Sequence, residues 1–271
     1  MVCKNWSALI LNDYEAVFPL TLNSKYKISY LYQPFFTRYL GVYSKIACTE
    51  TMVNAFFEAI PSNIQFIEFN IHENNNFTEA DFQKKERFFQ FLDLNKAYQD
   101  IFQDYKGDAK RNLKKAEKNN LKINENIAHE KIVNLFRNNK GKQIKELHSK
   151  DYEILKSLMI ACNIHKCGIA LGVMNTSNEL IAGGFFIRTK HRILFLKGSA
   201  NAEGKALGAM YLMIDELLKT YAQKIDCFDF GGSSLESIAS FNHNFGAKNC
   251  VYLQVKKNNL PFIVKLISGK K

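Results

Sequence analysis

The sequence contains few of the residues that interrupt helices and strands, with 4 Pro and 14 Gly among 271 residues, and it has 1 Trp. So little Pro and Gly excludes a collagen-like or linker-dominated protein. Hydrophobic residues make up 46% and charged residues 23%, which excludes a disordered chain because enough apolar surface is present to build a core. The length exceeds that of one ordinary domain, so we expect two.

Apolar runs of membrane-spanning length are also absent. Residues 206–214 form a run of nine, which is typical of a buried helix, whereas a span needs about 18–20 consecutive apolar residues. The N-terminal segment MVCKNWSALIL lacks the basic region, apolar core and cleavage site of a secretion signal. We therefore expect a cytoplasmic protein with no membrane span.

The 6 cysteines include no CxxC pair. Cys162, His165 and Cys167 are close in sequence, but no second pair of ligands with zinc spacing accompanies them. Cys227 and Cys250 lie in apolar, strand-like patterns and are expected to be buried, reduced thiols. The sequence thus predicts neither a metal site nor a disulfide framework.

The net charge of +11 is unevenly distributed along the chain. Residues 106–150 contain 13 basic and 5 acidic side chains, so 13 − 5 = +8 of the total lies in this segment. Such an excess attracts polyanions such as nucleic acid or an anionic nucleotide. A Lys-rich helix face that contacts only water gives the same pattern, and both interpretations stay open.

The hydrophobic pattern predicts a mixed α+β fold. In the first half we expect a helix at 49–60 and strands at 8–12, 16–22, 28–32, 65–70 and 87–92. Polar helices at 96–105 and 108–119 mark the junction between the halves. In the second half we expect helices at 127–139, 150–163 with Ser149 as N-cap, 205–221 and 235–245, and strands at 168–174, 180–188, 192–197, 225–230 and 251–256.

The strand 192–197, the helix 205–221 and the strand 225–230 form a right-handed parallel crossover in this scheme. The helix then starts beside the carboxyl end of the first strand, where free N–H groups favour an anion. Gly204, Lys205 and Gly208 open this helix. They suit a phosphate site and equally a helix start with small residues for close packing.

Three segments carry a resemblance to a known superfamily. FDFGGSSLESIASFNHNFGAK (228–248) resembles the C-terminal signature of the FemABX-like branch of the acyl-CoA N-acyltransferase (GNAT) fold. KRNLKKAEKNNLKI (110–123) resembles the basic helix that opens the second domain of those proteins, and YLYQPFFTRYLGVYS (30–44) resembles the first domain of acyltransferase-like relatives. The resemblance implies tandem GNAT-like domains, each a mostly antiparallel sheet with a splayed parallel pair and flanking helices. It gives an abbreviated, acceptor-binding domain at 1–106 and an acyltransferase domain with a basic leading helix at 107–271.

The activity that the resemblance implies is transfer of an acyl group from acyl-CoA to a small-molecule or peptide amine. Members of this branch that build peptidoglycan bridges use aminoacyl-tRNA instead, and a degenerate member would only bind an anionic partner. Two departures bear on the donor. Phe241-Asn242 replaces the F-K pair of the bridge-building members, and residues 201–208 match the CoA pyrophosphate loop only loosely.

The candidate site residues fall into three groups. The catalytic candidates are Asn242 as an oxyanion donor, His243 as a general base and Asp229 as a holder of the amine. The donor-binding candidates are Lys197, Ser199, Gly204, Lys205, Gly208 and Tyr211, and the candidates for binding substrate or an anion are Arg111, Lys115, Gly231, Gly232 and Ser233.

Several of these candidates have a purely structural alternative. Gly231 and Gly232 suit a strand-to-helix turn, and Ser233 with Glu236 forms a capping-box pattern. His243 and Tyr211 have packing roles available to them. The alternative for Asp229 is a buried carboxylate bonded to local amides.

Overall fold

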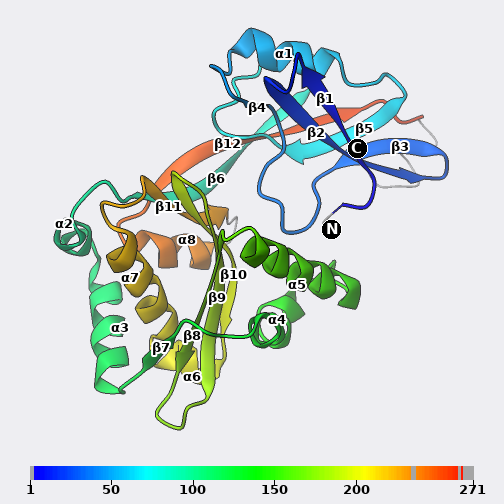
Figure 1. Cartoon of the computed structure of the whole chain (residues 1–271). Coiled ribbons are helices and arrows are strands. Elements are labelled where there is room, and N and C mark those ends of the chain that lie inside the picture. Colours follow the sequence, from blue (N-terminus) through cyan, green and yellow to red (C-terminus); the bar gives the residue numbers. More distant parts are fainter. Residues whose placement is uncertain (1–2, 233–235, 262–263, 265–271) are drawn as a thin grey trace. The chain divides into compact units, whose positions relative to one another are not determined.

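The computed structural model describes residues 3–232, 236–261 and 264. The chain forms two compact units (Figure 1). Unit 1 is Phe88–Cys250, and unit 2 comprises residues 3–87 with the described residues from 251 onward. The unit boundaries fall within two strands, β6 (Gln83–Asp93) and β12 (Lys248–Asn258). The boundary at 106/107 that the sequence suggested lies inside unit 1, and the functional division into 1–106 and 107–271 stays a prediction.

Unit 2 contains a sheet with the strand order β1-β2-β3-β5-β12. Its elements are β1 (Trp6–Leu11), β2 (Ala16–Lys25), β3 (Ile28–Tyr32), β4 (Tyr43–Ser44), α1 (Glu50–Glu58) and β5 (Ile64–Asn70). Strands β3 and β5 are parallel, and the other pairs of this sheet are antiparallel. Thr49 caps α1 by accepting from the Met52 amide at 3.2 Å. The buried side of α1 then packs Phe57 against Phe18, with ring centroids 5.1 Å apart.

Unit 1 has the strand order β6-β11-β10-β9-β8-β7. Its further strands are β7 (Lys122–Asn124), β8 (Gly168–Met174), β9 (Leu180–Arg188), β10 (Arg192–Ala200) and β11 (Cys227–Gly232). Only β10 and β11 run parallel in this order; their neighbours pair antiparallel. The predicted mixed α+β class, with mostly antiparallel pairing and some parallel pairs, is confirmed.

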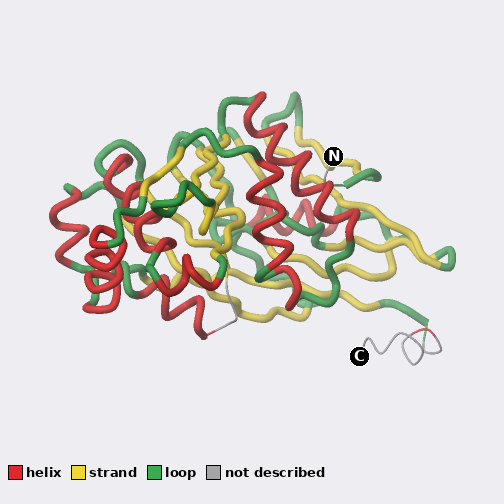
Figure 2. Tube along the Cα trace, turned by 90° about the horizontal axis from the view of Figure 1, so that it is seen from below, coloured by secondary structure: helices red, strands yellow, loops and turns green. Residues whose placement is uncertain are grey.

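Helices cover both faces of the unit 1 sheet. They are α2 (Tyr98–Gln103), α3 (Gly107–Lys118), α4 (His129–Asn138), α5 (Ser149–Ile164), α6 (Ala202–Ala206), α7 (Ala209–Tyr221) and α8 (Glu236–His243), with a 3₁₀ turn at Gly141–Gln143. Helices α3 and α7 lie on one face, and α4 and α5 on the other (Figure 1). The view from below again places the strands between two groups of helices (Figure 2). Phe186, Phe228 and Phe245, all fully buried, belong to the core between the sheet and α7.

Local structure departs from the sequence expectation at several places: strands β4 and β7 were not expected, and β6 and β12 are longer than expected. The expected helix 205–221 is two helices, α6 and α7, because Gly208 between them is left-handed with φ 75°. The N-cap of α5 is His148 rather than Ser149, and its amide donates to the Asp151 carboxylate at 2.8 Å. Strand β10 extends past the expected end at Lys197 to Ala200, with a bulge between Phe195 and Lys197.

Gly208 is required for two reasons: its positive φ and the close approach of α3. A Cβ at this position would lie 2.6 Å from the Asn112 carbonyl oxygen. Gly208→Ala is therefore expected to lower the free energy of unfolding by about 1–3 kcal/mol, measured by urea denaturation. Gly107→Ala is the matched control, since a Cβ there meets nothing closer than 3.6 Å in a helical residue; we expect it to stabilise by up to about 1 kcal/mol. Equal effects at the two positions would contradict this account.

The half-buried carboxylate of Asp215 joins α2 and the following turn to α7. Asp215 accepts hydrogen bonds from the hydroxyls of Tyr98 at 2.8 Å and Tyr105 at 2.9 Å. Burial raises the pKa of Asp215, and the two phenol hydrogen bonds oppose that rise without cancelling it. The folded state therefore holds the Asp215 proton more tightly than the unfolded chain does.

This raised pKa predicts a pH-dependent contribution to stability. The contribution is fully present below the ordinary aspartate pKa of about 3.9 and is lost as the pH rises through the higher pKa of the folded state. Asp215→Asn cannot ionise, so the decline in melting temperature across this window should be smaller in the variant. Asp13→Asn, at an exposed position, should leave the profile unchanged. An unaltered profile for Asp215→Asn would show that this carboxyl does not titrate in the window.

Candidate functional site

The parallel strands β10 and β11 are paired for only part of their length. The paired residues are Arg192 with Cys227, Ile193 with Phe228 and Leu194 with Asp229. Beyond this point β10 bulges and follows β9 to Ala200, while β11 follows β6 until Gly232 pairs with Phe89. The strands therefore diverge, as the resemblance implied for the splayed pair of the second domain.

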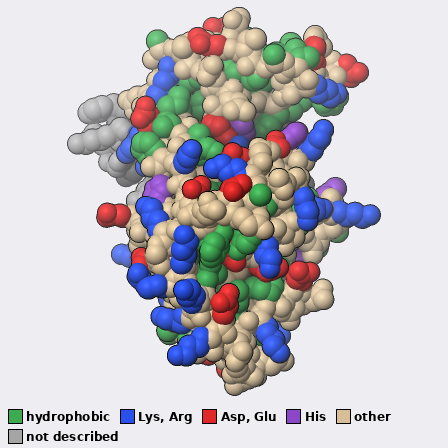
Figure 3. All heavy atoms as spheres, turned by 90° about the vertical axis from the view of Figure 1, so that its left-hand side faces the viewer, with side chains coloured by type: hydrophobic (Ala, Val, Ile, Leu, Met, Phe, Trp, Pro, Cys, Tyr) green, Lys and Arg blue, Asp and Glu red, His purple; other side chains and the backbone are tan. Residues whose placement is uncertain are grey.

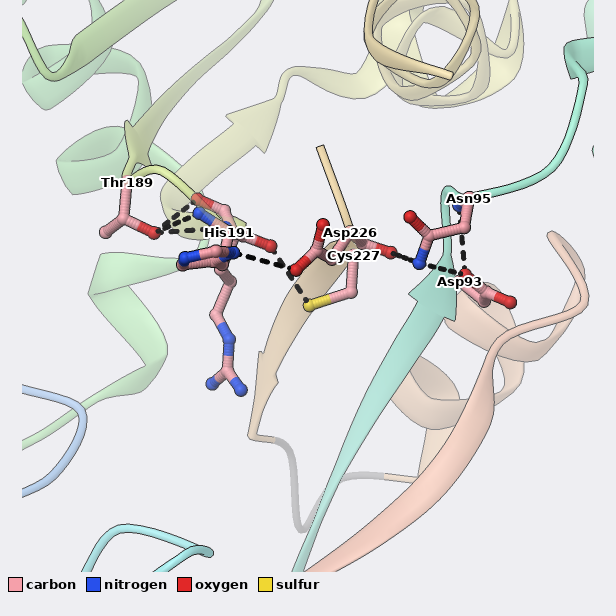
Figure 4. A network of polar contacts seen from close by, with 7 residues as sticks. Asp93, Asn95, Thr189, His191, Asp226 and Cys227 are labelled. Atoms are coloured by element: carbon pink, nitrogen blue, oxygen red, sulfur yellow. Dashed lines mark hydrogen bonds and ion pairs between the residues drawn. The ribbon is translucent and has the colours of Figure 1, made fainter. Parts of the chain in front are cut away.

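A network of polar contacts connects the first residues of these strands, at the end where they are paired (Figure 4). The Cys227 amide donates to the His191 carbonyl at 3.2 Å, and the His191 ring contacts the Asp226 carboxylate at 2.9 Å. The Asn95 side chain donates to the Asp226 carbonyl at 3.4 Å, which joins the segment after β6 to the same cluster. The two strands are paired at this end, so they separate only toward their carboxyl ends.

A cavity of about 320 Å³ lies where the strands diverge. It is lined by residues of β10, β11, α6, α7 and α8, and by Lys140, which lies shortly after the end of α4. The apolar part of the lining comprises Phe195, Ala200, Met210, Phe230, Ile238 and Phe241, and the polar part includes Lys140, Ser199, Lys205, Tyr211 and Asn242. A mostly apolar slot with a few polar groups is typical of a small-molecule site.

The structure brings five of the six donor-binding candidates to this cavity: Ser199, Gly204, Lys205, Gly208 and Tyr211. Lys197 is the exception. The bulge after Phe195 shifts the alternation of β10, and the Lys197 ammonium lies 5.6 Å from the ring of Phe136 on α4. A bulge adds one residue to one strand, so it changes which face the following side chains occupy.

The two glycines beside the cavity are explained by packing. The Gly204 amide donates to the Asn201 side chain at 2.7 Å, and a Cβ on Gly204 would overlap the Ile181 carbonyl of β9. Gly208 faces the Asn112 backbone, as described above. The amides of Ala209 and Met210 at the start of α7 have no hydrogen-bond acceptor within the described part of the chain. Of these two residues only Met210 lines the cavity, whereas Ala209 is fully buried, so the Met210 amide, rather than the glycines, is available to an anion.

Tyr211 is a neutral hydrogen-bonding group inside the cavity. Its hydroxyl accepts from the Asn244 side chain at 3.1 Å, and its ring packs 4.7 Å from Phe241 and 5.5 Å from Phe245. Burial raises the pKa of Tyr211, although the Asn244 hydrogen bond acts in the opposite direction. The phenol therefore keeps its proton at neutral pH and has it available to donate.

Asn242 lines the cavity and belongs to a buried chain of hydrogen-bonded side-chain amides. Its side chain is 1% exposed and donates to the Gln90 carbonyl oxygen at 2.9 Å. Gln90, 2% exposed, donates in turn to Asn249 at 3.0 Å. Gln90 was not predicted from the sequence, because nothing local marks a polar residue of β6 as the partner of a residue on α8.

The other two catalytic candidates lie outside the cavity lining that the described residues form. The His243 Nδ1 donates to the Ala247 carbonyl at 2.8 Å, which leaves Nε2 as the acceptor in the neutral ring. Asp229 is fully buried; its Oδ1 accepts from the Gly231 amide at 2.7 Å, and its Oδ2 lies 3.3 Å from the Arg192 guanidinium. Their catalytic roles stay predictions.

The remaining candidates are spread over the surface of unit 1. Arg111 forms an ion pair with Asp108, and the Lys115 ammonium donates to the Ala206 carbonyl at 3.1 Å. Lys and Arg side chains gather on the face that carries α3 (Figure 3). Gly231 is left-handed with φ 78°, as the turn interpretation requires. Ser233 and its predicted capping box lie outside the described residues, and Gly232 pairs with Phe89.

Sequence reasoning also missed Lys140, Phe195, Met210, Phe230 and Ile238 as cavity residues. The charge excess of 106–150 contains Lys140 but does not single it out. In the described ranges, no three His, Cys, Asp or Glu side chains are arranged to hold a metal ion. None of the helices that the structure describes has both the length and the hydropathy of a membrane span.

Solved structures with the same architecture include a crystal structure of FemX, with a TM-score of 0.68, 11% identity, and coverage of 97% of this chain and 90% of that one. L-PGS from Bacillus licheniformis has a TM-score of 0.56 at 9% identity and covers 97% and 87%. A tandem GNAT protein from the clavulanic acid biosynthesis pathway has a TM-score of 0.50 at 11% identity and covers 91% and 79%. No protein-family model and no curated protein matches the sequence. The fold is thus FemABX/GNAT-like.

The buried amide chain gives a stability test that is independent of any ligand. Asn242→Leu leaves the Gln90 carbonyl oxygen without its donor and should cost about 1–3 kcal/mol of unfolding free energy. Gln90→Leu combined with Asn242→Leu removes both partners, so the double variant should lose less than the sum of the single losses. Additive losses in urea denaturation would show that the two side chains are not coupled.

Proposed function

We propose that the protein is an N-acyltransferase that moves an acyl group from a CoA thioester to an amine. The observation that carries this proposal is the apolar cavity at the point where β10 and β11 separate. The proposal assigns donor binding and transfer to the predicted domain 107–271 and acceptor binding to 1–106. It also places the protein in the cytoplasm, where acyl-CoA is found.

The lining fits a thioester arm. Past Leu194 and Asp229 the two strands no longer pair with each other, so their facing edges are available to the amides of a pantetheine chain. Phe195, Met210 and Ile238 offer apolar contacts for the acyl group. Lys205 and Lys140 supply positive charge for phosphates, and the Met210 amide in the first turn of α7 adds a donor.

The chemical step that follows is a direct transfer. The amine nitrogen attacks the thioester carbonyl carbon, the C–N bond forms, and the C–S bond breaks to release the CoA thiolate. The Tyr211 phenol gives its proton to the departing sulfur and recovers one from solvent. Asn242, whose second amide hydrogen is not used by Gln90, donates to the developing oxyanion. Water or His243 takes the proton that the amine loses.

A second candidate uses aminoacyl-tRNA as the donor. The similarity to FemX across 97% of the chain and the exposed basic face of α3 favour it. In this case the ester carbonyl of the aminoacyl group occupies the same cavity, and phosphates contact Lys114 and Lys118 on α3. A third candidate, a degenerate member, binds an anionic partner without turnover, and that binding survives replacement of His243, Asp229 and Asn242 by Ala.

Ligand-induced stabilisation tests the CoA proposal. Acetyl-CoA and longer acyl-CoA esters at millimolar concentration should raise the melting temperature, because a ligand that binds only the folded state stabilises it. Ile238→Trp fills the cavity and should abolish this shift. Ile46→Trp adds the same ring at a position 48% exposed in unit 2 and should retain it. Tyr211→Phe should keep the shift but lower turnover about 10²-fold.

The outcomes separate the candidates. Absence of a shift with every CoA ester, together with tRNA binding that falls steeply with salt, would replace the CoA proposal by the tRNA one. In that case Lys114→Gln with Lys118→Gln should flatten the salt dependence. Binding of either donor without product formation would favour the degenerate member.

A further inference from the structure

The outer edge of β8 is open along Gly168–Leu171. Strand β7 pairs with β8 only at Gly172, Val173 and Met174. On the other side, β9 pairs with β8 along its whole length, and Arg188 N donates to the Cys167 carbonyl at 2.7 Å. This bond fixes the alternation of the antiparallel ladder, so the N–H and C=O groups of Gly168 and Ala170 point away from β9. No residue in the described part of the chain hydrogen-bonds to these outward groups.

A groove of about 830 Å³ runs along this open edge. Its floor is β8, and its two walls come from helices on opposite faces of the sheet (Figure 1). Helix α5 contributes Ile160 and Asn163, and helix α7 contributes Glu216 and Tyr221. The end of the groove is formed by residues 125–130, where the chain leaves β7 for α4. The four open residues of β8 span about 13 Å, enough for a short added strand.

The edge lacks the features that keep exposed strands from pairing. Natural edge strands are protected by Lys, Pro or a bulge. The open stretch reads Gly-Ile-Ala-Leu, and the register irregularity of β8 occurs later, between Val173 and Met174. An unprotected edge at the floor of a groove is a template for an extended segment.

The side chains of the groove select the chemistry of that segment. Glu130 and Lys156 pair with each other at 2.9 Å, whereas Glu125 and Glu216 have no ion pair among the described residues. The groove is therefore acidic in a chain with a net charge of +11. Ile160, 44% exposed, offers an apolar contact on the α5 wall. Successive side chains of an added strand point alternately to the two walls, so one set meets Ile160 and the other meets Glu216.

We propose that the open edge of β8 binds an extended segment of a partner protein with alternating apolar and basic side chains, by strand addition. The segment hydrogen-bonds to Gly168 and Ala170, lays its apolar side chains against Ile160 and directs its basic ones to Glu216. Strands β9 and β10 separate this edge from the cavity beside β11, so the binding is independent of acyl transfer.

The full-length protein and a fluorescein-labelled hexapeptide of alternating valine and lysine provide the test, by fluorescence anisotropy. We expect saturable binding that weakens with salt and protection of the Gly168 and Ala170 amides from hydrogen exchange. A valine–glutamate hexapeptide and the same basic peptide with alternate amides N-methylated should both bind at least tenfold more weakly.

Two pairs of variants locate the binding. Ala170→Pro removes only an outward N–H, which an edge strand tolerates, and should weaken binding at least tenfold. Ala170→Val keeps that N–H and should bind like the parent chain. Glu216→Lys should weaken binding about tenfold, whereas Glu153→Lys makes the same charge change on an exposed α5 residue outside the groove and should have little effect.

Three results would overturn the proposal: no binding of the basic peptide, equal binding of the N-methylated peptide, or undiminished binding by both Ala170→Pro and Glu216→Lys. If Ala170→Pro lowers the melting temperature so far that the chain is unfolded, the comparison of peptide binding by Glu216→Lys and Glu153→Lys tests the proposal by itself. Self-association of the chain that Glu216→Lys abolishes would assign the edge to a second copy instead.

Discussion

The structure of unit 1 depends on the point at which β10 and β11 stop pairing. Three residue pairs join the strands, and a polar network around His191 and Asp226 secures the start of both. Beyond Leu194, β10 stays paired with β9 and β11 stays paired with β6, but β10 and β11 no longer pair with each other. Backbone groups in such a gap are costly if they are buried without partners. The gap persists because the bulge in β10 bends that strand away, and because aromatic side chains line the resulting cavity.

The contacts that α7 makes with α2 and α3 hold it beside the cavity. The left-handed Gly208 lies between α6 and α7, so Met210 in the first turn of α7 lines the cavity. Close contact with the Asn112 backbone fixes α3 on α7, and the Asp215 hydrogen bonds hold α2 there as well. The basic side of α3 is consequently a surface of the same unit that contains the cavity. Positive charge therefore lies both on α3 and at Lys140 and Lys205 in the cavity lining.

The sequence pattern predicted most elements to within a few residues, because amphipathic periodicity and Pro or Gly punctuation are local signals. Helix α1 and strands β8 and β9 are examples. The predictions were weaker where the outcome depended on contacts between distant segments. The break at Gly208 is one case, since a single glycine in a helical pattern is compatible with a continuous helix. Another is the hydrogen bond of Asn242, since its partner Gln90 lies on β6, far away in the sequence.

The sequence by itself determined the mixed α+β class, the parallel crossover from β10 through α7 to β11, and the placing of Ser199, Lys205 and Tyr211 beside the end of β10. These follow from local pattern and chain connectivity. Only the tertiary structure decided that Lys197 points to α4, that Asn242 is joined to Gln90, and that β7 ends early enough to leave an edge of β8 open. A bulge, a buried hydrogen bond and the length of a strand pairing each depend on residues far apart in the chain, and no local pattern encodes them.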